Sequence, residues 1–154
     1  VPERLGSLGW VRTMPYPGFP TDAQAPLMAA ALKADGTTVF TETIFQNRYR
    51  HVSEMARMGA RVRTEGKVAI VTGVPRLHGA SVRCTDLRGG AALCAAALTA
   101  EGQSVIAEIH HIERGYEHLD ESLRQLGANI TRSDHETEAE ETEQPTTSEE
   151  GAGA

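Results

Sequence analysis

Aspartate and arginine residues occur at matching places in two parts of the sequence, and this pairing is the first indication of chemistry. Asp22 and Asp86 are 64 positions apart, and Arg48 and Arg114 are 66 positions apart. Each aspartate precedes a run of small apolar residues, and each arginine follows a β-rich run. A carboxylate can accept a proton from a hydroxyl, and a guanidinium group pairs with phosphate or carboxylate oxygens. These residue types suit a phosphorylated, carboxylated substrate that reacts with an alcohol.

A third arginine, Arg88, lies two residues after Asp86, in the expected first turn of a helix. A positive charge at that end opposes the helix dipole, so it needs a compensating interaction. An anion bound against the free N–H groups would supply one. Structural alternatives stay open at this point. The aspartates could simply cap helices, and Arg48 and Arg114 could form surface ion pairs or contact strand-end carbonyls.

The elements that must position these residues also occur twice. Each copy has a small-residue helix that starts at a Thr-Asp pair, then a Val-, Ile- and Thr-rich strand, then an amphipathic helix. The expected helix, strand and helix cover residues 24–35, 37–44 and 51–60 in the first copy and 87–101, 103–109 and 117–128 in the second. The first copy continues into a hairpin that turns at Glu65-Gly66, and the second fades near residue 130. This order predicts an α/β domain over residues 1–132, with repeat units at about 14–80 and 81–132.

The C-terminal residues 133–154 differ in composition from the rest of the chain. They hold eight of the 21 carboxylates, no Lys or Arg, and no Val, Leu, Ile or aromatic side chain. A segment that cannot bury apolar surface does not offset its ordering entropy, so a disordered acidic tail is predicted. The remaining 15 basic and 13 acidic side chains leave the body slightly basic, so the net charge of -6 belongs to the tail. No nucleic-acid partner is expected.

Cysteine, apolar and histidine content limit the class of protein further. Cys84 and Cys94 both lie in apolar stretches, which favours reduced thiols in a cytoplasmic protein over a disulfide framework. The longest nearly uncharged stretch, residues 89–100, is much shorter than the roughly 20 residues of a membrane span, so a soluble protein without a membrane partner is expected. The six histidines, including His110 and His111, show no convincing metal-ligand spacing, so no metal is expected.

Four segments in register resemble the C-terminal domain of the UDP-N-acetylglucosamine 1-carboxyvinyltransferases: PYPGFPTDAQ, ETIFQNRYRHVSEMARMGA, TDLRGGAAL and HHIERGYEHLDESLRQLGA. The similarity runs from about Met14 to Arg132. It implies part of an inside-out α/β barrel whose two domains each contain three βαβαββ units, two of them held here. It also implies transfer of the enolpyruvyl group of phosphoenolpyruvate to the 3-hydroxyl of UDP-N-acetylglucosamine. In this family that reaction opens peptidoglycan synthesis in the cytoplasm and needs no metal or organic cofactor.

The resemblance implies roles for six residues. Asp22 matches the carboxylate that faces the sugar 3-hydroxyl, which makes it the expected general base. The residues that match the arginines holding phosphoenolpyruvate are Arg48, Arg88 and Arg114. Asp86 matches a carboxylate that stabilises a cationic carbon or relays a proton, and Ile44 matches a position that lines the nucleotide site.

Two family features have no match in this sequence. They are a lysine near the N-terminus and a loop cysteine that acts as general acid, a role that neither Cys84 nor Cys94 fits. The remainder of the enzyme chain is therefore an expected partner, and this chain alone is expected to be inactive. Two alternatives remain: a 3-phosphoshikimate 1-carboxyvinyltransferase of the same fold, and a non-catalytic anion-binding or assembly module.

Overall fold

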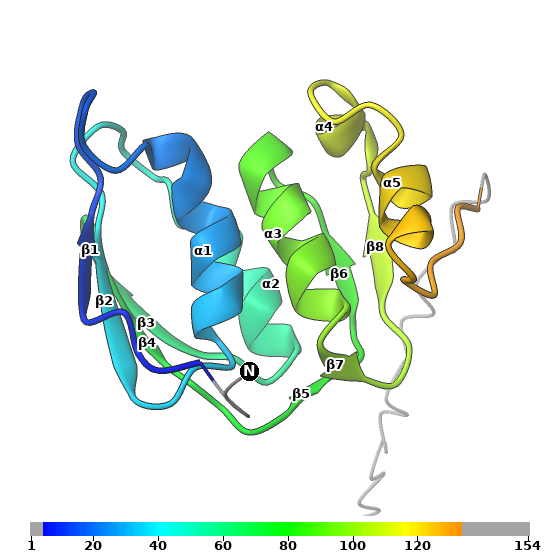
Figure 1. Cartoon of the computed structure of the whole chain (residues 1–154), viewed down its shortest axis with the longest axis horizontal. Helices are drawn as coiled ribbons and strands as arrows, with labels where there is room; N and C mark the ends of the chain where they lie inside the picture. Colours follow the sequence, from blue (N-terminus) through cyan, green and yellow to red (C-terminus); the bar gives the residue numbers. More distant parts are fainter. Residues whose placement is uncertain (1–4, 134–154) are drawn as a thin grey trace, which may run out of the picture.

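Two helices of small residues form the centre of the molecule. A computed structural model describes residues 5–133, and the predicted acidic tail, apart from Ser133, lies outside the described residues. Helices α1 (Gln24–Ala31) and α3 (Leu87–Ala97) lie side by side, with a four-stranded sheet on one side and a two-stranded parallel pair on the other (Figure 1). Buried Ala29 and Ala96 leave room for close approach of the two helices, while Met28 and Leu93 fill the core.

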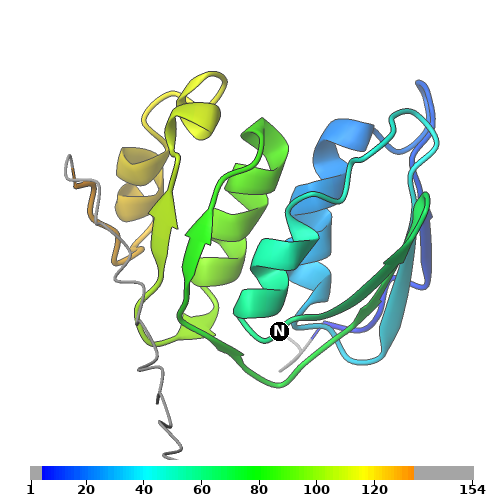
Figure 2. The ribbon, with the colours of Figure 1, turned by 180° about the vertical axis from the view of Figure 1, so that it is seen from behind.

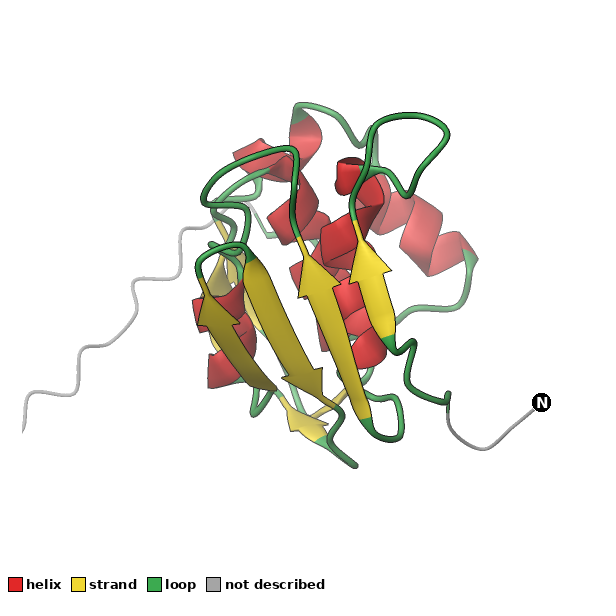
Figure 3. Ribbon diagram, turned by 90° about the vertical axis from the view of Figure 1, so that its left-hand side faces the viewer, coloured by secondary structure: helices red, strands yellow, loops and turns green. Residues whose placement is uncertain are grey.

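The four-stranded sheet contains β1 (Trp10–Arg12), β2 (Thr37–Thr41), β3 (Arg61–Glu65) and β4 (Val68–Thr72) in the order β1-β2-β4-β3. Strand β1 runs parallel to β2, and the other neighbours are antiparallel. Helices cover one face of this sheet (Figure 3). Accordingly Ala69 and Val71 are buried, whereas Ile70 between them is 41% exposed. The predicted hairpin is confirmed, and Gly66 turns it with a φ of +55°.

The second half repeats the parallel strand-helix-strand arrangement. Strands β6 (Ser81–Arg83) and β8 (Val105–Ala107) pair in parallel and are connected through α3, as β1 and β2 pair in parallel and are connected through α1 (Figure 2). A second short parallel pair joins β5 (Leu77–His78) to β7 (Ala100–Glu101). Helices α4 (His110–Glu113) and α5 (Leu119–Gln125) follow β8. The predicted α/β class is therefore confirmed.

Helix α2 (Val52–Arg57) and the 3-10 turn η1 (Thr21–Ala23) complete the first half. Helix α2 buries Met55, and the next residue after the helix, Met58, packs in the same core, as the spacing of the apolar residues predicts. The turn η1 lies directly before α1. It contains Asp22 and directly follows the proline-containing segment, residues 15–20.

Several element boundaries differ from the sequence-based expectation. Helix α1 ends at Ala31 because the next residues tighten into turns, with Lys33 N–H donating to Ala30 O. Residues 100–101 form β7 rather than the end of the second helix. Strand β1 precedes the predicted start at residue 14, because three residues give too short an alternation to indicate a strand. The four-residue helix α4 replaces a loop.

Candidate active site

The predicted site residues follow the carboxyl ends of the parallel strands. Asp22 comes after β1, Arg48 after β2, Asp86 and Arg88 after β6, and Arg114 after β8. The starts of α1 and α3 and the helix α4 all lie toward the same end of the molecule (Figure 1). Ligand sites of open α/β sheets gather at this end, because parallel strands finish at a common edge. The duplicated topology thus brings residues from distant parts of the chain to one rim.

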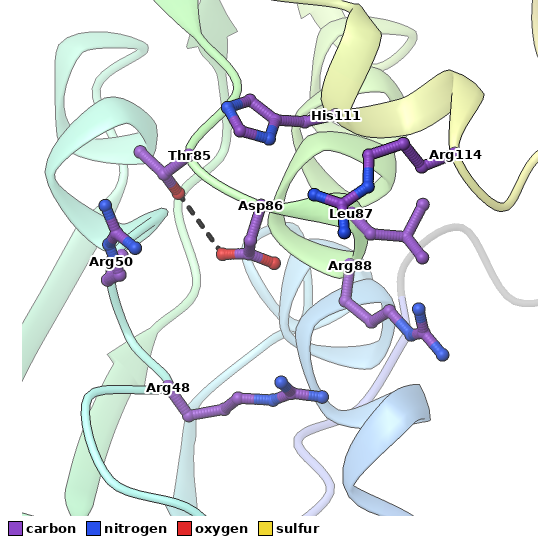
Figure 4. A pocket seen from close by; sticks show the side chains of 8 residues that line it. All are labelled: Arg48, Arg50, Thr85, Asp86, Leu87, Arg88, His111 and Arg114. Atoms are coloured by element: carbon purple, nitrogen blue, oxygen red, sulfur yellow. Dashed lines mark hydrogen bonds between the residues drawn. The ribbon is translucent and has the colours of Figure 1, made fainter.

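An open pocket of about 460 Å³ lies at this rim. Its lining side chains are Arg48, Arg50, Thr85, Asp86, Leu87, Arg88, His111 and Arg114 (Figure 4). Four guanidinium groups therefore surround a single lining carboxylate, and the pocket suits an anion carrying more than one negative charge. A second hollow, of about 500 Å³, lies on β3 and β4 beside Arg63 and Glu65. Its lining carries one positive and one negative charge, so no group of arginines converges on it.

Asp22 lies beside the pocket and bridges two of its arginines. Its Oδ1 accepts a hydrogen bond from Arg48 Nη2 at 3.0 Å, and its Oδ2 lies 3.1 Å from Arg88 Nη2. The Asp22 side chain is 59% exposed, so a solute can reach it. The structural alternative for Asp22, capping of the first helix, does not hold, because Ala23 occupies that position and no side chain makes a capping bond. Its two oxygens face arginines instead.

Asp86 caps α3, whereas Asp22 does not cap α1. Its Oδ1 accepts a 2.8 Å hydrogen bond from Gly89 N–H, so it caps the helix, and its Oδ2 accepts a 3.3 Å bond from Thr85. These bonds fix the carboxylate while it lines the pocket. Asp86 therefore both caps α3 and lines the pocket.

The loop from residue 42 to residue 51 positions Arg48. The Arg48 guanidinium lies 4.9 Å from the centre of the Phe45 ring, a cation–π contact that holds it over the loop. Ile44 belongs to the same loop, with its side chain 37% exposed, but it does not line the pocket. Its predicted contact with a nucleotide stays a prediction. Within residues 5–133, Arg114 has no carboxylate at ion-pairing distance, so its donors are available to a ligand.

Glu42 is a buried carboxylate at the base of this loop that the sequence analysis did not single out. Its side chain is 1% exposed and accepts hydrogen bonds from the hydroxyls of Thr13 and Thr21 and from the N–H groups of Ile44 and Phe45. Burial acts to raise the pKa of Glu42, but these four bonds outweigh it and hold the pKa below its usual value. A lone Glu at the end of a strand gives no sequence signal, because its partners come from other segments.

His51 is a second buried titratable group close to the site. It is fully buried, and burial lowers its pKa to about 4; nearby Asp86 acts in the opposite direction, and Arg48 adds to the lowering. The imidazole is therefore neutral at physiological pH. A methyl group added at Gly89 would lie 3.0 Å from His51 Cβ, so His51 packs beneath the start of α3. Only the fold shows this, since His51 resembles any helix-start residue in sequence.

A group of three possible metal ligands lies next to the pocket. Donor atoms of Glu108, His110 and His111 all fall within 4.8 Å of one another. Spacing along the sequence indicated no ligand partner for the histidine pair, whereas the folded chain places the Glu108 carboxylate beside it. Glu108 and His110 are exposed, and exposed groups of this kind are common without a metal. The geometry permits a cation without specifying one.

Both cysteines are free and buried, in agreement with the predicted reduced thiols. Burial raises the pKa of Cys84 to about 12 and that of Cys94 to about 11. Neither thiol lines the pocket. Among residues 5–133, no helix combines the length and apolar character needed to cross a bilayer.

Comparison with known proteins identifies the family. Residues 3–123 match the family model described as EPSP synthase (3-phosphoshikimate 1-carboxyvinyltransferase). The chain belongs to this family. It is 54% identical over 131 residues to UDP-N-acetylglucosamine 1-carboxyvinyltransferase 1 of Symbiobacterium thermophilum. The matched region covers 85% of this chain and 30% of that protein. It is 55% identical to the protein of the same name from Caldanaerobacter subterraneus, with 79% of this chain and 29% of that protein covered.

The inferred resemblance is thus confirmed, and the chain spans about 30% of the length of these two relatives. Solved structures agree with this enolpyruvyl transferase assignment. The enolpyruvyl transferase NikO from Streptomyces tendae superposes with a TM-score of 0.73 at 31% identity, over 81% of this chain and 28% of that chain. EPSP synthase from Acinetobacter baumannii superposes with a TM-score of 0.60 at 21% identity, over 73% of this chain and 27% of that chain, and shows the shared fold alone.

Proposed function

We propose that this chain forms the arginine-rich part of the active site of a UDP-N-acetylglucosamine 1-carboxyvinyltransferase. The complete enzyme transfers the enolpyruvyl group of phosphoenolpyruvate to the sugar 3-hydroxyl, the first committed step of peptidoglycan synthesis. It acts in the cytoplasm, and its product is needed for cell shape and division. The observation that carries the proposal is the bridge from Asp22 to Arg48 and Arg88 beside a pocket that also contains Asp86 and Arg114.

The arginines suit the two anionic groups of phosphoenolpyruvate. Each guanidinium has five N–H donors, and Arg48 and Arg88 each use one terminal nitrogen for Asp22. The remaining donors can bind phosphate or carboxylate oxygens without displacing Asp22. Arg114 adds a third planar fork, from the same half of the fold as Arg88. Binding at this rim places the enol carbon next to both carboxylates.

Asp22 is the proposed general base. It is exposed, and its position is fixed by two charged partners, so a sugar hydroxyl can reach a carboxylate of defined orientation. In the addition step the 3-hydroxyl loses its proton to Asp22, and its oxygen bonds to carbon 2 of phosphoenolpyruvate. Carbon 3 gains a proton from the general acid. Loss of phosphate from carbon 2 and of one proton from carbon 3 then restores the double bond in the product.

Asp86 is proposed to act on the charge that develops at carbon 2. Protonation of phosphoenolpyruvate at carbon 3 leaves carbon 2 with cationic character, which a nearby carboxylate stabilises. The cap to Gly89 and the bond from Thr85 hold Asp86 in place, so little reorganisation is required. A proton relay through the same carboxylate is the alternative role.

The general acid is proposed to come from the remainder of the enzyme. Cys84 and Cys94 are buried away from the pocket, and the N-terminal lysine expected for the family has no match in this chain. We therefore expect no turnover from the 154-residue chain alone. The proposed reaction itself requires no metal or organic cofactor. Turnover by the isolated chain at a rate comparable to the complete enzyme would contradict this division of the active site.

A second acceptor is possible on chemical grounds, because the matching family model carries the name of the shikimate 3-phosphate enzyme. The same arginines would bind phosphoenolpyruvate in either reaction. Relatives at 51–55% identity are named for the sugar nucleotide, and this favours UDP-N-acetylglucosamine.

The deciding experiment measures phosphate release from phosphoenolpyruvate by the complete protein, with UDP-N-acetylglucosamine or shikimate 3-phosphate as acceptor. We expect release with the sugar nucleotide only. Release with shikimate 3-phosphate alone would assign the other reaction. Absence of release with both acceptors, combined with retained phosphate binding, would favour the non-catalytic anion-binding module.

A further inference from the structure

Glu42 connects three segments that converge on the proposed site. Its Oε2 accepts a 2.9 Å hydrogen bond from the hydroxyl of Thr21, the residue immediately before Asp22. Its Oε1 accepts bonds from Ile44 N–H at 2.8 Å and Phe45 N–H at 3.1 Å, in the loop that leads to Arg48. One buried carboxylate therefore contacts the residue before Asp22 and the backbone of the loop that carries Arg48.

The third segment is represented by Thr13, the residue directly after β1. Thr13, 1% exposed, donates to Glu42 Oε1 at 2.9 Å, and its hydroxyl oxygen accepts a bond from Thr43 N–H at 2.9 Å. The Thr43 hydroxyl in turn donates to Thr13 O. Thr13, just before the proline-containing segment, and Thr43, at the start of the Arg48 loop, are thus joined by two hydrogen bonds. In each bond the side chain of one residue contacts the backbone of the other.

We propose that Glu42 is a positioning residue that sets the relative placement of Asp22 and Arg48. The inference rests on the proposed function, and it extends that function to a group that does not contact the pocket. The carboxylate acts through two links: Oε2 holds the turn carrying Asp22, and Oε1 holds the loop carrying Arg48 and its Phe45 contact. Without these bonds, four buried or partly buried donors lose their acceptor, and the loop and the turn are free to shift apart.

The donors make different demands on the two oxygens. The N–H groups of Ile44 and Phe45 require an acceptor at Oε1. The Thr21 hydroxyl donates to Oε2, and a hydroxyl could equally accept a bond from an amide N–H placed there. Glutamine at position 42 can therefore keep the arrangement, with its oxygen toward the loop and its amide toward Thr21. Alanine cannot keep either link. Valine at position 21 removes only the link to the Asp22 turn.

The test uses the complete enzyme and compares Glu42→Ala, Glu42→Gln and Thr21→Val with Thr38→Val as matched control. Thr38 lies in β2 and is 1% exposed, and its hydroxyl oxygen accepts a bond from Leu8 N–H, away from the site. Displacing reacting groups by about 1 Å can cost roughly 100-fold in rate. We expect Glu42→Ala and Thr21→Val to lower kcat by about 10- to 100-fold. Glu42→Gln and Thr38→Val should stay within a few-fold of the parent enzyme.

Two readouts separate positioning from a general loss of structure. In an Asp22→Asn background, Thr21→Val should change kcat by less than about twofold, because its effect passes through Asp22. Equal losses with Asp22 present or absent would overturn the proposal, as would Thr21→Val and Glu42→Ala behaving like Thr38→Val. Inorganic phosphate binding, followed by calorimetry, is independent of turnover. Glu42→Ala should weaken it several-fold through Arg48, so an unchanged phosphate affinity overturns the inference even if the proposed reaction fails.

Discussion

Arg88 Nη2 lies 3.1 Å from Asp22 Oδ2, and this contact joins the two copies of the repeated unit. Asp22 precedes α1, and Arg88 occupies the first turn of α3, the corresponding helix of the second copy. The carboxylate compensates a positive charge that would otherwise oppose the dipole of α3. It also means that neither copy can form the site by itself.

Arg114 should contribute directly to binding of phosphoenolpyruvate. It lines the pocket, and within the described residues no carboxylate pairs with it. A hydrogen bond to a charged group contributes about 1.5–3 kcal/mol. Arg114→Ala in the complete enzyme should therefore raise the Kd of phosphoenolpyruvate about tenfold or more. Calorimetric titration in the presence of the sugar nucleotide measures this change.

Arg124→Ala is the matched control for Arg114→Ala. Arg124 pairs with Asp120 on α5 at 3.1 Å and does not line the pocket. Its removal should leave the Kd within about twofold, as expected for an exposed helix pair. A Kd for Arg114→Ala equal to that of the control would remove Arg114 from the ligand contacts.

His51 should make the stability of the fold depend on pH. Its folded-state pKa of about 4 lies below the value of about 6.5 expected for the unfolded chain. Between these values the unfolded state binds a proton that the folded state does not. The stabilising contribution is therefore complete above about pH 6.5 and is lost as the pH falls toward 4, by about 3 kcal/mol in total.

Urea unfolding of the complete protein at pH 7.5 and pH 4.5 measures this effect of His51. His51→Leu replaces the buried imidazole with a group that does not titrate. The free energy of unfolding should fall less in His51→Leu than in the parent protein over this interval. Parallel losses in the two proteins would show that His51 does not carry the pH dependence.

The sequence predicted those parts of the structure that depend on local pattern. Small residues before Gly36 and Gly102, and apolar residues three or four apart in α2 and α5, indicated the helices of both copies. The alternating β-rich runs indicated β2, β8 and the hairpin. These signals are local because helix and strand periodicity is determined within a single segment. The confirmed α/β class follows from their order.

Other features depend on contacts between distant segments and could not be predicted in this way. The Thr-Asp pairs before α1 and α3 look equivalent in sequence, yet Asp86 caps its helix and Asp22 bridges two arginines. The difference arises because the 3-10 turn moves Asp22 two residues away from the start of α1 and toward the second copy. Glu42 and His51 owe their importance to burial, which their own flanking residues do not specify.

The two cysteines should react slowly with thiol reagents in the folded protein. Burial raises the pKa of Cys84 to about 12 and that of Cys94 to about 11, so almost no thiolate forms at pH 8. Modification by an aromatic disulfide should be about 100-fold slower than after unfolding in urea. Peptide mapping by mass spectrometry identifies the two sites. Rapid modification of either cysteine without denaturant would contradict the buried placement.

The role of Asp22 is tested most directly by substituting Asp22→Asn in the complete enzyme. The substitution preserves shape but removes the proton acceptor, and Asp120→Asn, which breaks the Arg124 pair on α5, is the control. Phosphate release and the Kd of UDP-N-acetylglucosamine are measured for each variant. We expect Asp22→Asn to lower kcat by about 100-fold or more while the Kd changes only a few-fold. An Asp22→Asn enzyme that releases phosphate at the rate of the Asp120→Asn control would contradict the account.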